Sequence, residues 1–171
     1  MSYATAALAT YANMLGTLDH LVVKASEHEK GNALLDARLA EDMYPLGTQI
    51  RFTVAQVNIA LDRLGNLGLE LDESDIGDFA DARARIAKAQ GLVVATDPSA
   101  WPASDAVVEF DLPNGMGFAM QAHEYLRDWA TPQFYFHLMT TYSLLRMAGV
   151  EVGKADYVPH MMKYLKTPTG S

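Results

Sequence analysis

Cysteine is absent from the 171-residue chain. No disulfide, thiolate metal site or thiol nucleophile can therefore form, and any chemistry must use oxygen and nitrogen groups. Positive charge is also scarce, because 13 lysines and arginines stand against 21 acidic residues and give a formal net charge of −8. Phosphate backbones and anionic membrane surfaces attract positive charge, so this balance argues against nucleic-acid and membrane partners.

Long hydrophobic runs are missing as well. No window approaches the roughly 20 consecutive apolar residues that a transmembrane helix needs. The N-terminal segment has no basic leader and is interrupted by Thr5, Thr10 and Asn13, so it reads as the start of a helix. We therefore expect a soluble, cytoplasmic protein, and the length fits a single domain over residues 1–171.

Three familiar catalytic patterns are also missing: a phosphate-binding loop, a dinucleotide fingerprint after a strand, and a serine nucleophile elbow. What the chain does have is helical periodicity in four segments. Apolar residues recur at three- and four-residue steps over about 3–29, from about Asp36 or Glu41 to 67, from about 75 to 96, and over 131–148. We expect Ser74 or Asp75 to cap the third helix.

Pro45 lies near the beginning of the second helical segment. A proline is accepted in the first turn of a new helix, or it kinks a helix that continues through it. Both interpretations remain open from the sequence.

A different pattern separates the third and fourth helical segments. Two short runs of strand character flank Asn114-Gly115, a strong signal for a β-hairpin over about 106–121. A hairpin is marginal alone and should lie on the helices. The sequence therefore predicts an all-α protein, a four-helix bundle with a short hairpin inserted between helices three and four and a C-terminal tail over about 150–171.

Two of the predicted helices are apolar on opposite sides. A helix that is apolar nearly all round is either central in its domain or lies at a subunit contact, where a second copy is the commonest partner. We hypothesise a homodimer, while helices one and three and the hairpin could instead cover these faces within one subunit. The second apolar sides are formed by Phe52, Ala55 and Ile59 and by Phe136, Ser143 and Met147.

The five histidines do not form a helical metal motif. Such a motif places two ligands four residues apart, and four residues after His137 the chain has Thr141. His137 remains a candidate metal ligand if other helices supply the remaining groups. The alternative is a buried histidine whose nitrogens are hydrogen-bonded.

Polar residues also recur every seven positions along the second helical segment, at Asp42, Gln49, Gln56 and Arg63. This spacing places them along one side of a helix. If that side turns inward, Gln49 can approach His137 across the bundle, as a ligand or as a hydrogen-bond donor to a substrate. Otherwise the line is a solvated flank.

Two stretches of the chain resemble a bacterial family of unknown function within the DinB/YfiT-like superfamily. With the helical spacing between them, the similarity covers nearly the whole chain and implies a DinB-like, commonly dimeric four-helix bundle. The stretches are Leu34 to Leu46 followed by Gln49, and the later run of Phe134 to His137, Thr141-Tyr142, Leu145-Arg146, Gly149-Val150 and Gly153-Lys154-x-Asp156-Tyr157.

The resemblance implies less about function. Members of the superfamily include metal-dependent thiol transferases, isomerases and hydrolases, with one histidine on the second helix and a His-x-x-x-His pair on the fourth. This sequence matches only His137 of that set, which leaves a weakly held divalent metal as one expectation and a small-molecule ligand as another. A divergent metal-dependent hydrolase or thiol transferase and a purely structural or interaction module are the alternatives. The expected ligand-binding residues are Asp42, Tyr44, Gln49, His137, Thr141 and Tyr142, with His137 as the metal ligand.

Overall fold

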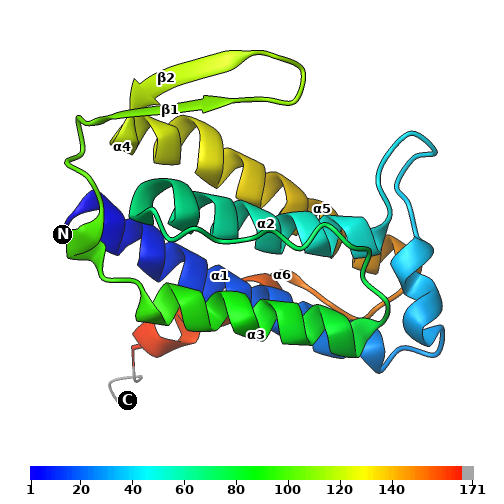
Figure 1. Ribbon diagram of the computed structural model, residues 1–171. Coiled ribbons are helices and arrows are strands. Elements are labelled where there is room, and N and C mark those ends of the chain that lie inside the picture. Colours follow the sequence, from blue (N-terminus) through cyan, green and yellow to red (C-terminus); the bar gives the residue numbers. More distant parts are fainter. Residues whose placement is uncertain (167–171) are drawn as a thin grey trace.

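The computed structural model describes residues 1–166 and shows four long helices lying side by side (Figure 1). Helices α1 and α5 run in one direction, and α2 and α3 run in the opposite one. Helix α2 packs against both α5 and α3, and α1 packs against α3. This confirms the predicted all-α bundle. The long helices are α1 (Tyr3–Ser26), α2 (Leu46–Gly65), α3 (Phe79–Ala95) and α5 (Thr131–Ala148).

The periodic apolar residues form the core between the helices. All six predicted residues of α1 and all five of α3 are buried, since a stripe of this width is removed from water only when another helix covers it. None of the helices in the described part of the chain is long and apolar enough to span a bilayer. The buried stripes are Leu8, Tyr11, Leu15, Leu18, Val22 and Ala25, then Phe79, Ala82, Ile86, Ala89 and Val93.

The second helix begins later than the periodicity predicts. Residues Gly31–Asp36 form a separate 3-10 turn, η1, and α2 begins only at Leu46, with Pro45 in extended conformation as its N-cap. A proline disfavours helical conformation in the residue before it, so the predicted start at Asp36 or Glu41 is wrong. Of the two interpretations of Pro45, the start of a new helix is the right one.

The cap of α3 is also displaced from the prediction. Asp78, rather than Ser74 or Asp75, is the N-cap, and its carboxylate accepts a hydrogen bond from the backbone N–H of Asp81 at 2.7 Å. Residues 66–78 instead run back along α2 before α3 begins (Figure 1). The ends of α5 agree with the prediction, and Gly149 terminates the helix with a φ of 95°.

The predicted hairpin is present between α3 and α5. A 3-10 turn, η2 (Pro98–Ala100), leads to strands β1 (Val107–Asp111) and β2 (Gly117–Gln121), which pair antiparallel with Asp111 opposite Gly117. A short helix α4 (Ala122–Glu124) and a π-helical turn η3 (Tyr125–Ala130) then join the hairpin to α5. The π turn was not predicted from the sequence.

Arg63 of α2 fastens the hairpin to the bundle. Its guanidinium carbon lies 4.0 Å from the Phe110 ring centroid, and its Nη1 donates to the Tyr125 hydroxyl at 3.1 Å. We expect Arg63→Met to lower the free energy of unfolding by about 1–3 kcal/mol, because it removes a cation–π contact and a hydrogen bond. Urea unfolding measures this change. Arg83→Met, which removes an exposed ion pair on α3, should change stability little, and an equal loss in the two variants would contradict the role of Arg63.

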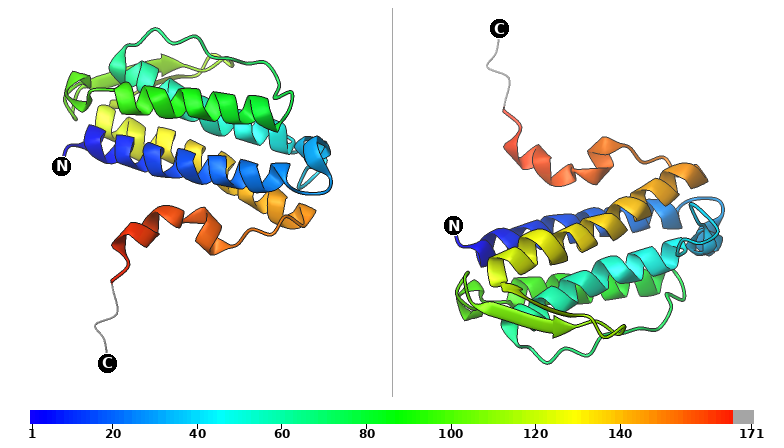
Figure 2. Two further views of the ribbon diagram at one scale, coloured as in Figure 1. Left: turned by 90° about the horizontal axis from the view of Figure 1, so that it is seen from below. Right: turned by 90° about the horizontal axis from the view of Figure 1, so that it is seen from above.

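The C-terminal segment returns along α1 as α6 (Lys154–Tyr157) and the 3-10 turn η4 (Pro159–Tyr164) (Figure 2). Thr17 of α1 donates to the Tyr157 carbonyl at 3.1 Å, and His20 lies 2.8 Å from the Asp156 carboxylate. Hydrogen bonds from His20 and from the Gly153 backbone lower the pKa of Asp156 to about 2. The predicted tail over 150–171 is therefore docked as far as it is described, and residues 167–171 lie outside the described residues.

Candidate functional site

His137 and Gln49 meet where α5 and α2 pack together. The Nδ1 of His137 lies 2.8 Å from Gln49 Oε1, and Gln49 Nε2 donates to the Tyr44 carbonyl at 3.3 Å. Because the amide nitrogen must face a carbonyl acceptor, the amide oxygen faces the ring. His137 Nδ1 therefore carries the proton, and Nε2 holds an unshared electron pair.

Two aromatic rings contact this imidazole. The ring of Phe52 lies 5.0 Å from the His137 ring, the ring of Phe136 lies 5.1 Å from it, and Tyr44 extends the row with a 5.2 Å edge contact to Phe52. These are the separations at which aromatic rings attract one another. No residue in 1–166 forms a hydrogen bond with Nε2, which leaves a free hydrogen-bond acceptor on a ring that contacts two phenylalanines.

Burial keeps the imidazole neutral. The partly buried position lowers the pKa of His137 to about 4, because the charged form is less well solvated there. No carboxylate hydrogen-bonds to the ring to offset this effect in the described residues. At neutral pH the group can accept a proton or a hydrogen bond at Nε2, or bind a metal there.

The structure places the six expected site residues in different surroundings. Gln49 and His137 are in contact, and Tyr44 joins them through the Phe52 ring. Asp42 is exposed in the connection before α2 rather than on the helix, because that helix begins later than predicted.

The two other expected residues make contacts of their own. Thr141 is fully buried, and its hydroxyl donates to the His137 carbonyl at 3.0 Å. The ring of Tyr142 packs against Tyr157 of the C-terminal segment. The structure shows no hydrogen bond from either side chain to the His137 ring within the described residues.

Sequence reasoning missed Phe52 and Phe136 as members of the site. It assigned both only to apolar helix sides, because ring contacts between helices depend on how the helices are rotated against each other. Of the polar heptad line, Gln49 is 2% exposed and turned inward, whereas Gln56 and Arg63 are partly buried. The one available signal was that Phe136 directly precedes the only histidine on α5.

The residues at this position do not fit the three-ligand metal site that the superfamily resemblance implies. Gln49 lies where α2 faces His137, and Thr141 occupies the position of the second histidine. Neither supplies an imidazole or a carboxylate. Across residues 1–166, no three histidine, aspartate or glutamate side chains converge in a way that could hold a metal ion.

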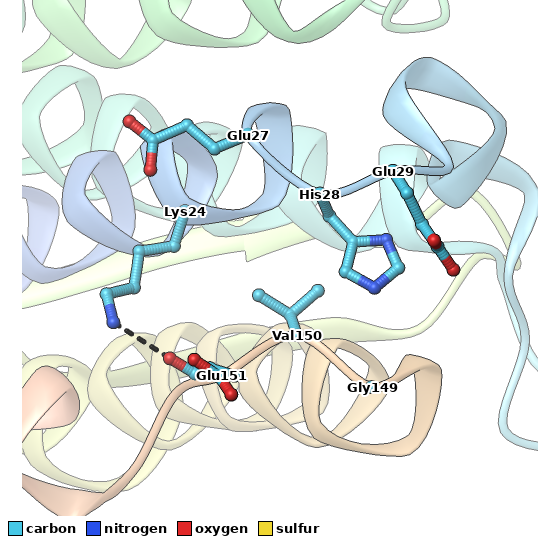
Figure 3. A pocket seen from close by; sticks show the side chains of 7 residues that line it. All are labelled: Lys24, Glu27, His28, Glu29, Gly149, Val150 and Glu151. Carbon is cyan, nitrogen blue, oxygen red and sulfur yellow. Dashed lines mark hydrogen bonds between the residues drawn. The ribbon is translucent and has the colours of Figure 1, made fainter.

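A separate cleft lies at the end of the bundle where α1 ends and α5 turns into the C-terminal segment (Figure 3). It has a volume of about 420 Å³ and carries the carboxylates of Glu27, Glu29 and Glu151. Lys24 crosses it and donates to the Glu151 carbonyl at 2.8 Å. His137 does not line this cleft, so the cleft and the α2–α5 site are separate.

The bundle, its hairpin insertion and the pair of facing polar residues on α2 and α5 define a DinB-like protein. The chain belongs to the family described as "Domain of unknown function (DUF1993)", whose model matches residues 3–158. It is also similar to a crystal structure of a DinB family member from Shewanella denitrificans, at 27% identity and a TM-score of 0.75 over 96% of this chain and 92% of that one. A comparison with curated proteins gave no match.

Proposed function

We propose that this protein is a homodimer that binds a small aromatic molecule carrying a hydrogen-bond donor. The observation that carries the proposal is His137 Nε2, an unprotonated acceptor on an imidazole that contacts the Phe52 and Phe136 rings. A planar ligand with a hydroxyl or N–H group can stack on these rings and donate to the imidazole. Gln49 fixes the ring orientation before the ligand arrives, which reduces the entropy lost on binding.

Large apolar side chains are exposed around this site. We call the surface formed by Tyr44, Phe52, Phe136, Met139 and Met147 the α2–α5 face. Tyr44 is 59% exposed, Phe136 56% and Met147 54%. An exposed apolar surface that continues across two adjacent helices is typical of an interaction site.

A second copy of the chain is the partner that we propose for this face. A twofold axis brings the same apolar surface from both subunits together, so one surface covers itself without a specialised partner. The hairpin already covers the far end of α2 at Arg63, and the uncovered part lies next to it. In such a dimer the space beside His137 is enclosed between subunits, which strengthens a hydrogen bond to Nε2.

The binding proposal is tested with 4-fluorophenol, whose ring and hydroxyl match the site, by ¹⁹F NMR titration. We expect saturable binding that weakens about five- to tenfold in His137→Phe, because one hydrogen bond is worth about 1 kcal/mol or somewhat more. 4-Fluoroanisole has the same ring without the donor and should bind the native protein about as weakly as 4-fluorophenol binds this variant.

The matched control is His28→Phe, which replaces a histidine in the separate acidic cleft and should leave 4-fluorophenol binding unchanged. Equal binding of the two probes, or an equal loss in the two variants, would contradict recognition by His137. If the protein is folded and neither probe binds, the result would favour the alternative that the protein is a structural or interaction module.

A weakly held divalent metal on His137 is the second candidate. A histidine whose Nδ1–H is fixed by an oxygen acceptor has the orientation typical of a metal ligand that binds through Nε2. Elemental analysis after mild purification is the test: about one equivalent of metal would favour a divergent hydrolase or thiol transferase, and less than about a tenth of an equivalent would contradict it.

A further inference from the structure

The α2–α3 groove contains a second, more enclosed cavity, which His137 does not line. Residues 70–72 of the connection close it from outside, and helices α2 and α3 form its walls. Its volume is about 50 Å³, enough for a few waters or for the headgroup of a small molecule. The lining residues are Arg51, Val54, Ala55 and Asn58 of α2, Glu70, Leu71 and Asp72, and Arg85 and Lys88 of α3.

Two polar atoms of this lining are buried without a partner. Neither Arg51 Nε nor Asn58 Oδ1 forms a hydrogen bond within the described chain. A buried polar group left unpaired destabilises the fold, and more so when the group is charged. The ring of Phe52, 4.6 Å from the Arg51 guanidinium carbon, contacts the face of that group and leaves its N–H edge free.

The charges around the cavity favour an anion. Three cationic side chains line it against two acidic ones. Arg85 is fully engaged by Asp81 and by the connection, and Asp72 pairs with Arg85 at 3.4 Å. Arg51 and Lys88 form no ion pair with any described residue, and with Glu70 and Asp72 counted the lining carries one positive charge in excess.

The cavity is held open by the connection itself. Leu69 N–H donates to Asp62 at 2.9 Å on one side, and Arg85 donates to the Ser74 carbonyl at 2.9 Å on the other. These contacts position the connection above Arg51 without supplying it a partner. A preformed site of this kind loses little entropy when a ligand enters.

We infer that this cavity binds the carboxylate group of a small organic acid. The Nε and one Nη of a guanidinium present two parallel N–H groups that match the two oxygens of a carboxylate. Asn58 donates to the same group when its amide is rotated by a half turn, and Lys88 adds charge at the mouth. The small volume selects a carboxylate headgroup over a larger phosphate or sulfate.

The experiment follows the Arg51 Nε–H signal of the native protein by NMR during titration with sodium acetate at constant ionic strength. We expect a saturable shift with half-saturation near about 10 mM or below, and no saturable shift with chloride. Lys88→Met should weaken acetate binding several-fold. Arg83→Met removes a cation on the same helix that pairs instead with Asp19 and should leave acetate binding unchanged.

Arg51→Leu assigns the signal and should abolish acetate binding, because it removes the two N–H groups that hold the carboxylate. A linear response to acetate, or the same response to chloride, would overturn the inference and leave the cavity to water. Sulfate or phosphate binding as tightly as acetate would overturn the assignment to carboxylates. The native-protein titration decides these outcomes even if the leucine variant does not fold.

Discussion

Acidification from about pH 7 to about pH 4.5 should lower the free energy of unfolding by about 2 kcal/mol through His137 alone. The pKa of this residue falls to about 4 in the folded protein, against about 6.5 in an unfolded chain. Between these values the unfolded state binds the proton more readily, so stability is complete above pH 6.5 and is lost as the pH falls toward 4. The full shift corresponds to about 3 kcal/mol, and partial exposure of the ring reduces it.

Urea unfolding at a series of pH values measures this dependence. His137→Gln keeps a donor for Gln49 and should flatten the profile between about pH 6.5 and 4. Gln49→Glu places a carboxylate beside Nδ1–H, which favours the charged imidazole and raises the pKa of His137. Acidification should then increase stability through this residue instead of lowering it. Parallel profiles for the native protein and both variants would show that His137 is not held neutral by its surroundings.

Phe136→Asp should weaken dimerisation by about 30-fold or more. The aspartate puts a charge at the centre of the proposed interface, and a buried aromatic anchor of this kind typically contributes about 2 kcal/mol or more to association. The Phe136→Asp subunit should still fold, because the Phe136 side chain is largely exposed in the single subunit. Sedimentation velocity over a range of micromolar concentrations measures the change.

Val94→Asp is the matched control, because Val94 is 83% exposed and lies on α3, outside the α2–α5 face. It should leave the association unchanged. A native protein that sediments only as a monomer over the same concentrations would contradict the homodimer. Equal dissociation of the two variants would place the contact on another surface.

The sequence predicts the helices well where tertiary packing only reinforces the local pattern. Apolar periodicity predicts the bounds of α5, which ends at Gly149. It also predicts the complete apolar stripe of α3, which ends at its C-cap Thr96. The α2 start does not follow, because apolar residues at Leu39 and Met43 happen to continue the period through a non-helical connection. There the local effect of Pro45 outweighs the periodicity.

Of the candidate site, only the pairing of Gln49 with His137 could be predicted from the sequence. The heptad spacing placed Gln49 on an edge that could turn inward, and the structure brings it to His137. The flanking rings, the unprotonated Nε2 and the inward orientation of Thr141 depend on how α2 and α5 are rotated about their axes. That rotation is set by the whole core, so no local pattern in the sequence reports it.

The most direct test of this account is the protonation state of His137, measured by two-bond ¹H–¹⁵N NMR on protein with ¹⁵N-labelled histidine and assigned with His137→Gln. The account predicts a neutral ring at pH 7, with the proton on Nδ1 and none on Nε2, that becomes charged only below about pH 5. A proton on Nε2 at neutral pH, or a titration near the ordinary histidine pKa of about 6.5, would contradict it.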